Sequence, residues 1–139
     1  MKRLAVLGCL LALAGSPALA LDCAGGVCVL PGMAKGDVTT AAMKTVVAGG
    51  KAVVIDARPT APERIPGSKV LAGTPTAEEA AKVIPSKDTP VITYCGNTRC
   101  TLSPKLAEHL KSLGYTNVRE YPEGIAGWKS AGNPVEAAM

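Results

Sequence analysis

Short apolar runs alternate with stretches of helical periodicity along this chain. Residues 52–55 are a continuous apolar run rich in β-branched residues, which is typical of a strand buried on both faces of a parallel sheet. Residues 90–94 form a second run rich in β-branched residues, which is predicted to be another strand. After the second run, leucines recur at intervals of four, four and three residues. This spacing predicts a helix with one apolar face, formed by Leu102, Leu106, Leu110 and Leu113 and ended by Gly114.

The other segments extend this alternation. The further predicted elements are a helix capped by Asp37 and ended by Gly49-Gly50, a strand at 69–72, a helix capped by Thr76 and stopped by Pro85, a strand at 118–121 and a helix at 125–130. Thr101 or Ser103 is expected to cap the leucine helix. Residues 21–36 are predicted to be irregular with at most a short strand at 27–30, and residues 58–68 form a loop. Strands alternating with helices predict an α/β domain with a mostly parallel central sheet flanked by helices.

The first twenty residues have the pattern of a secretory signal peptide. A basic start at residues 1–3 precedes an apolar run from Leu4 to Ala14, and Ala18-Leu19-Ala20 places small residues where a signal peptidase cleaves. Lipidation at Cys9 is the less favoured alternative, because the apolar run continues past that residue. We therefore expect residues 1–20 to be removed and the mature protein to be periplasmic or secreted.

Charge and length then exclude several classes of function. The chain of 139 residues has a net charge of +4, and removing residues 1–20 takes away Lys2 and Arg3, which leaves 119 residues and a charge of +2. That length suits one domain, which we assign to residues 37–136 behind an arm at 21–36. Without a basic cluster we predict no nucleic-acid partner. Without a second long apolar stretch we predict no membrane association after signal removal.

The four cysteines of the predicted mature chain form two pairs with the same Cys-x4-Cys spacing. Cys23 and Cys28 enclose a Gly-containing turn, and in an oxidising compartment we interpret them as a local disulfide, with metal binding as the minor alternative. Cys95 and Cys100 form the second pair. Four cysteines allow three connectivities, and spacing does not choose among them.

Cys95 directly follows the strand predicted at 90–94, at the sheet edge where α/β proteins collect ligands. Backbone N–H groups of the following loop, the N-terminus of the leucine helix and the charge of Arg99 would favour a thiolate there. Such a thiolate suits attack on an anionic substrate. We therefore predict that Cys95 is the catalytic nucleophile, with a buried structural thiol as the alternative. The predicted substrate-binding residues are Gly96, Asn97, Thr98, Arg99, Cys100 and Thr101.

Phosphate-ester hydrolysis is a related chemistry that the spacing disfavours. Cysteine phosphatases hold phosphate with an Arg that follows the Cys after five intervening residues, which here is position 101. Thr101 occupies that position, and Arg99 comes two residues too early.

Five motifs occur in the order found in one known family. They are Val53-Val54-Ile55-Asp56-Ala57-Arg58, Ile65-Pro66-Gly67-Ser68, Tyr94-Cys95, Leu113-Gly114-Tyr115, and Glu123-Gly124-Ile125-Ala126-Gly127-Trp128 followed by Ala131-Gly132-Asn133-Pro134-Val135. On these motifs the chain resembles a single-domain rhodanese, a sulfurtransferase, over about residues 37–136. The resemblance implies a rhodanese-like α/β fold.

The resemblance also implies an activity for Cys95. Its thiolate would attack the outer sulfur of a donor such as thiosulfate, sulfite would leave, and the Cys95 persulfide would pass its sulfur to a thiol, cyanide or another nucleophile. The implied partners are therefore a small anionic sulfur donor and a nucleophilic acceptor, which includes a protein thiol. Neither a cofactor nor a metal is implied.

Two departures from the family pattern leave alternatives open. Arg64 stands where a His usually precedes Ile-Pro-Gly, and the segment from Cys95 to Gly114 is about two residues longer than in common members. Cys100 either resolves a persulfide on Cys95, forms a reversible disulfide with it, or is a small apolar residue under the helix start. The alternative functions are thus a thiol–disulfide redox protein and a catalytically silent rhodanese-type binding module. We interpret Asp56 and Arg58 as a structural polar pair.

Overall fold

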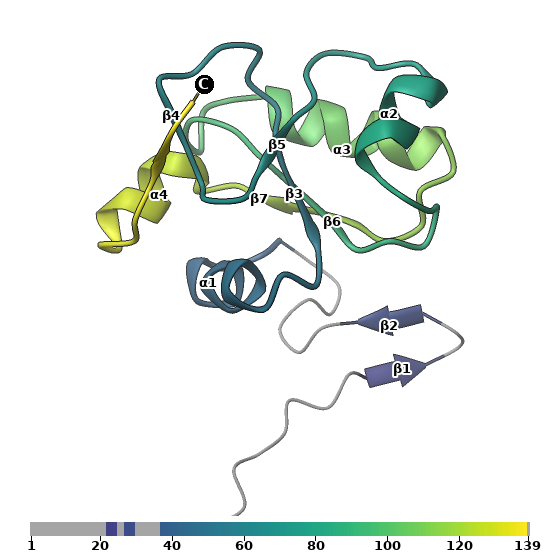
Figure 1. The fold of residues 1–139 in the computed structure, drawn as a ribbon, viewed down its shortest axis with the longest axis horizontal. Coiled ribbons are helices and arrows are strands. Elements are labelled where there is room, and N and C mark those ends of the chain that lie inside the picture. Colours follow the sequence, from purple (N-terminus) through teal and green to yellow (C-terminus); the bar gives the residue numbers. More distant parts are fainter. Residues whose placement is uncertain (1–21, 25–26, 30–36, 139) are drawn as a thin grey trace, which may run out of the picture.

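A four-stranded parallel sheet organises the fold (Figure 1). The structure is a computed structural model and describes residues 22–24, 27–29 and 37–138. The strand order is β5-β3-β6-β7, and the strands are β3 (Val53–Asp56), β5 (Lys69–Val70), β6 (Val91–Tyr94) and β7 (Val118–Tyr121). All four lie within the predicted segments or one residue beyond them. The predicted α/β fold with a parallel central sheet is confirmed.

Helices cover both faces of this sheet (Figure 1). They are α1 (Thr40–Gly49), α2 (Ala77–Val83), α3 (Leu102–Ser112) and α4 (Gly124–Ser130). A hydrophobic core lies on each face of the sheet, and neighbouring residues of β3 belong to different cores because side chains alternate along a strand. Ile55 packs with the residues of α2 and α3, whereas Val54 packs with those of α1 and α4. The central strands β3 and β6 are therefore buried on both sides, which explains their largely apolar sequences.

Two short antiparallel pairs were not predicted. In the arm, β1 (Asp22–Ala24) pairs with β2 (Val27–Val29), with Cys23 opposite Cys28, so the arm contains two strands rather than one. In the loop at 58–68, β4 (Glu63–Arg64) pairs with β8 (Glu136–Ala137). Strands of two or three residues are too short to show a period. The signal peptide at 1–20 and the disulfide between Cys23 and Cys28 lie outside what the structure describes.

The starts of the helices partly differ from the predictions. Thr39, not Asp37, caps α1: its Oγ1 accepts a hydrogen bond from the Ala42 N–H at 3.3 Å. The residues just before this cap contact β7 instead: the Val38 N–H donates to the Glu120 carbonyl at 2.7 Å. Thr76 caps α2 as predicted and forms a full capping box with Glu79.

The start of α3 also corrects two predictions. Thr101 precedes the helix but its side chain makes no capping hydrogen bond, and Ser103 is buried instead of capping. Leu106 and Leu110 are buried as predicted, whereas Leu102 is 40% exposed because it begins the helix directly after an exposed loop. No helix among the described residues is long and apolar enough to cross a membrane.

Candidate functional site

Cys95 lies at the carboxyl end of β6, next to the first turn of α3. It is a free thiol with only 1% of its surface exposed. The strand fixes the start of α3 as well, since the Thr93 hydroxyl donates to the Ser103 carbonyl at 3.1 Å. The predicted position of Cys95 at a strand end, followed by a loop and a helix, is thus what the structure contains.

The N-terminus of α4 holds the backbone of this cysteine loop. The Ile125 N–H donates to the Cys95 carbonyl and the Ala126 N–H donates to the Gly96 carbonyl, both at 3.0 Å. Gly124 makes this approach feasible. Its φ is +59°, and a Cβ at this position would lie 2.4 Å from the Cys95 carbonyl oxygen. A glycine is therefore required where α4 meets the loop.

The loop stabilises its own backbone at Asn97. The side-chain oxygen of Asn97 accepts from the Arg99 N–H, and its carbonyl accepts from the Cys100 N–H, both at 3.0 Å. The predicted substrate-binding residues surround this turn, with Gly96 and Cys100 half-buried and Asn97, Thr98, Arg99 and Thr101 exposed. Because the turn uses two of the loop N–H groups, the prediction that the loop donors converge on Cys95 was wrong for those two.

The sulfur of Cys95 is instead contacted from α3 and from Cys100. The Ser103 hydroxyl lies 3.3 Å from the Cys95 Sγ, and the Ser103 N–H also donates to that sulfur. Burial raises the pKa of the Cys95 thiol, and its hydrogen bond to the Cys100 sulfur raises the pKa further, while the two bonds from Ser103 lower it. The net direction is upward. In this geometry Cys95 is therefore a protonated thiol, not the preformed thiolate that we predicted.

Cys100 is the more acidic of the two thiols. Burial alone would raise its pKa, but a hydrogen bond from the Cys95 thiol, bonds from the N–H groups of Gly96 and Leu102, and the positive charge of Arg58 lower the pKa below its ordinary value. Two of the backbone N–H groups that we expected to stabilise a Cys95 thiolate, those of Gly96 and Leu102, thus bond the Cys100 sulfur instead. The two thiols therefore influence each other's pKa, so that the site contains two interacting thiols.

The family follows from a comparison with known proteins. The rhodanese-like domain model matches residues 39–131. The chain belongs to the rhodanese-like domain family. No curated protein matches it.

Solved structures share this rhodanese-like fold. The BH2092 protein from Bacillus halodurans superposes with a TM-score of 0.66 at 26% identity, over 73% of this chain and 77% of that one. SseA from Escherichia coli, a 3-mercaptopyruvate sulfotransferase, gives 0.62 at 18% identity, over 74% of this chain and 50% of that one. A thiosulfate sulfurtransferase from Pseudomonas aeruginosa gives 0.60 at 21% identity, over 75% of this chain and 20% of that one.

A buried polar cluster lies at the carboxyl ends of β3 and β6. The predicted pair is present: the Arg58 guanidinium contacts the Asp56 carboxylate at 2.7 Å, and Asp56 is 1% exposed. The Tyr94 hydroxyl donates to the same carboxylate at 3.0 Å and accepts from the Ile65 N–H. The positive charge of Arg58 also lowers the pKa of Cys100, so this ion pair at the end of β3 interacts electrostatically with the cysteine loop.

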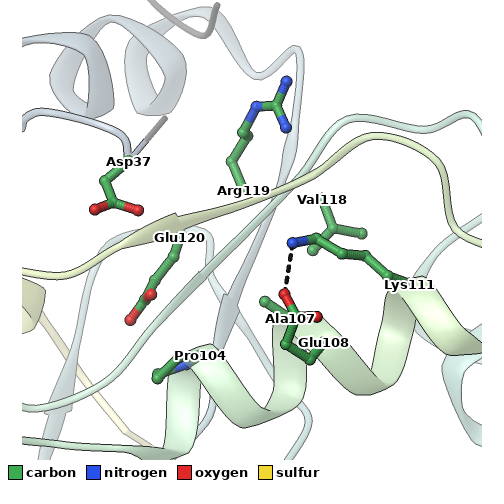
Figure 2. A pocket seen from close by; sticks show the side chains of 8 residues that line it. All are labelled: Asp37, Pro104, Ala107, Glu108, Lys111, Val118, Arg119 and Glu120. Carbon is green, nitrogen blue, oxygen red and sulfur yellow. Dashed lines mark hydrogen bonds and ion pairs between the residues drawn. The ribbon is translucent and has the colours of Figure 1, made fainter. Parts of the chain in front are cut away.

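Two residues of the site were missed by the sequence predictions. Ser103, considered only as a helix cap, contacts the Cys95 sulfur and the Glu120 carboxylate. Glu120 lies in β7, where two charged residues interrupt an otherwise apolar parallel strand. That interruption was a signal for a polar role. Glu120 lines a hollow between β7, α3 and Asp37, and Figure 2 shows its side chain extending toward Pro104 in the first turn of α3.

Proposed function

We propose that this rhodanese-like domain is a sulfurtransferase that carries a sulfane sulfur as a persulfide on Cys95. The observation that carries the proposal is the position of the free Cys95 thiol, which ends β6 with its backbone held by α4 and its sulfur bonded by Ser103. Two structures with the same fold are a thiosulfate sulfurtransferase and a 3-mercaptopyruvate sulfotransferase. Both support sulfur transfer as the reaction class.

The reaction needs one thiolate and one anionic donor. The Cys95 thiolate attacks the outer sulfur of thiosulfate, the S–S bond of the donor breaks, and sulfite leaves with the electron pair. A thiol, cyanide or a protein thiol then takes the outer sulfur from the persulfide. Ser103 stabilises the sulfur anion through its hydroxyl and N–H. The loop residues 96–101, with the exposed Arg99, bind the donor.

Export completes the proposal. The signal-peptide pattern at 1–20 supports a mature protein that works in the periplasm or outside the cell, where small anionic sulfur compounds are its donors. Intact-mass measurement of the protein isolated from an exporting host tests this, because cleavage after Ala20 removes the mass of residues 1–20. An unprocessed mass contradicts export.

A thiosulfate:cyanide assay combined with intact-mass measurement tests the transfer. The parent protein should gain the mass of one sulfur atom with thiosulfate and lose it when cyanide is added, with thiocyanate formed. Cys95→Ser should reduce both signals to background, since Cys95 is the residue proposed to carry the sulfur. The proposal fails if Cys95→Ser transfers sulfur as well as the parent. It also fails if the parent forms no adduct with any sulfur donor, which would leave a catalytically silent binding module.

A thiol–disulfide redox function is the second candidate. It is favoured by one observation, the presence of two free thiols, Cys95 and Cys100, that are near enough to influence each other's pKa. Mild oxidation should then join the two sulfurs, protect both from alkylation and lower the intact mass by two hydrogen atoms. If both thiols stay alkylatable after oxidation, this candidate is excluded.

A further inference from the structure

A continuous polar chain leads from the Cys95 sulfur to the Glu120 carboxylate. The Ser103 Oγ lies 3.3 Å from the Cys95 Sγ and 2.8 Å from the Glu120 Oε1. Ser103 is 1% exposed and Cys95 is equally buried, whereas Glu120 is half-buried. The chain therefore runs from the closed interior of the site toward a group that solvent can reach.

A hydroxyl carries one proton, so Ser103 can donate to only one of its two neighbours at a time. The carboxylate is the stronger acceptor, since hydrogen bonds to ionised oxygen are shorter and stronger than bonds to neutral sulfur. When Ser103 donates to Glu120, the lone pairs of its oxygen face the Cys95 Sγ. In that arrangement the serine oxygen can accept the thiol proton.

We propose that Glu120, acting through Ser103, takes the proton of Cys95 when the thiol attacks its sulfur donor. This inference rests on the proposed sulfur transfer and adds the group that makes the nucleophile. In the step, the S–H bond of Cys95 breaks and its electron pair stays on sulfur. The proton bonds to the Ser103 oxygen while the Ser103 proton passes to the Glu120 carboxylate.

The transfer leaves the charge of the site unchanged. Before it, the carboxylate carries one negative charge beside a neutral thiol, and after it, the thiolate carries that charge beside a neutral carboxylic acid. No additional charge has to be buried, which would be costly at a site this enclosed. A base is needed because the raised pKa of Cys95 favours the protonated thiol, which must lose its proton before it can attack the donor.

The proton leaves through the hollow that Glu120 lines (Figure 2). The charged groups that share this hollow are Asp37, Glu108, Lys111 and Arg119. Glu108 and Lys111 form an exposed ion pair with each other at 2.7 Å. The other titratable group at the Cys95 sulfur is Cys100, which is the competing proton acceptor.

Glu120→Gln tests the relay because an amide keeps the shape and the acceptor oxygen but takes no proton. Rapid mixing with thiosulfate, followed by quenching and mass measurement, gives the rate of persulfide formation. The same experiment with the preformed persulfide and cyanide gives the rate of sulfur removal. We expect persulfide formation at neutral pH to fall by about 100-fold. Sulfur removal should keep its parent rate, since it takes no proton from Cys95. The deficit should shrink as alkaline pH ionises Cys95 directly.

Four further variants make the outcome decisive. Glu108→Gln is the matched control, because it removes a carboxylate from the same hollow without contacting Ser103, and both of its rates should match the parent. Ser103→Ala should slow persulfide formation as Glu120→Gln does and should also slow sulfur removal, because its hydroxyl stabilises the sulfur anion. The double variant should form the persulfide no more slowly than the slower single one. Cys100→Ser reports on the competing acceptor. Circular dichroism and thermal melting confirm that each variant is folded.

Two results overturn the relay. One is unchanged persulfide formation in Glu120→Gln, and a deficit in Cys100→Ser alone would then assign the proton to Cys100. The other is an equal loss in both half-reactions of Glu120→Gln, which indicates a structural role. Absence of any persulfide in the parent is a different result, since it contradicts the proposed function rather than the relay.

Discussion

Cys95 and Cys100 lie in one loop, yet their thiols differ in acidity because different groups reach them. Cys95 ends a buried strand, so it loses hydration and its pKa rises. Cys100 lies at the entry to α3, where the N–H groups of Gly96 and Leu102 bond its sulfur and Arg58 adds a positive charge, so its pKa falls. Cys95 therefore has the higher pKa of the two thiols and Cys100 the lower.

This difference predicts the order of chemical labelling. With limiting iodoacetamide at pH 7, Cys100 should be alkylated before Cys95, because a lowered pKa gives a larger thiolate fraction and Cys100 is also less buried. Peptide mass spectrometry after short labelling times measures the order. In denaturant the two cysteines should react at similar rates. Faster labelling of Cys95 in the folded protein would contradict the assignment.

At the scale of elements, α4 positions the site although none of its side chains is placed in it. Its first N–H groups bond the carbonyls of Cys95 and Gly96, so the end of β6 and the start of α4 form one rigid unit. The close contact depends on Gly124, at which any Cβ would strike the loop backbone. Rigid placement of the sulfur matters because small displacements of a reacting group lower rates steeply.

Gly124→Ala and Gly132→Ala separate this contact from backbone strain. Both glycines have positive φ, +59° and +75°, but a Cβ at Gly132 meets nothing within 4 Å. Each substitution should cost about 1–2 kcal/mol from strain. Only Gly124→Ala should also slow persulfide formation, by about 10- to 100-fold, because the loop must move. Urea unfolding measures the loss of stability, and the rapid-mixing assay measures the rate of persulfide formation. Equal rates of persulfide formation in both variants would refute the anchoring role.

For the whole molecule, the buried Tyr94 hydroxyl connects the sheet to the turn before β5. It donates to the Asp56 carboxylate, accepts from the Ile65 N–H and lies 3.0 Å from the Ser68 Oγ. Burial raises the pKa of Tyr94 to about 12, since the bonds from Ser68 and Ile65 offset only part of the burial and the neighbouring Asp56 carboxylate raises the pKa further. Ionising this hydroxyl would place a second negative charge beside Asp56.

Stability should accordingly fall at alkaline pH. The folded pKa of about 12 exceeds the ordinary value of 10.0, so this contribution is complete below pH 10 and is lost as the pH rises toward 12. The linked loss is about 2–3 kcal/mol. Urea unfolding at pH 8 and near pH 12 should show Tyr94→Phe less stable than the parent at pH 8 but less sensitive to the rise. A parallel decline in both proteins would contradict this.

The sequence by itself determined the architecture and the position of Cys95. Continuous β-branched runs and helical spacing require no partner to be recognised, since buried parallel strands and amphipathic helices impose those periods locally. Thr76 as a helix cap follows for the same reason, because its capping box lies within four residues. The motifs around Asp56, Cys95 and Trp128 were enough to indicate the family.

The tertiary structure alone decided the surroundings of the sulfur. The Ser103 hydroxyl meets Glu120 across 17 positions of sequence, and the Thr39 cap replaced Asp37 because Val38 pairs with β7. Acidity depends on burial and on which N–H groups point at a sulfur, and both are set by packing between distant segments. The sequence thus placed Cys95 at a strand end, whereas its contact with Ser103 and, through Ser103, with Glu120 emerged only when β6, β7 and α3 came together.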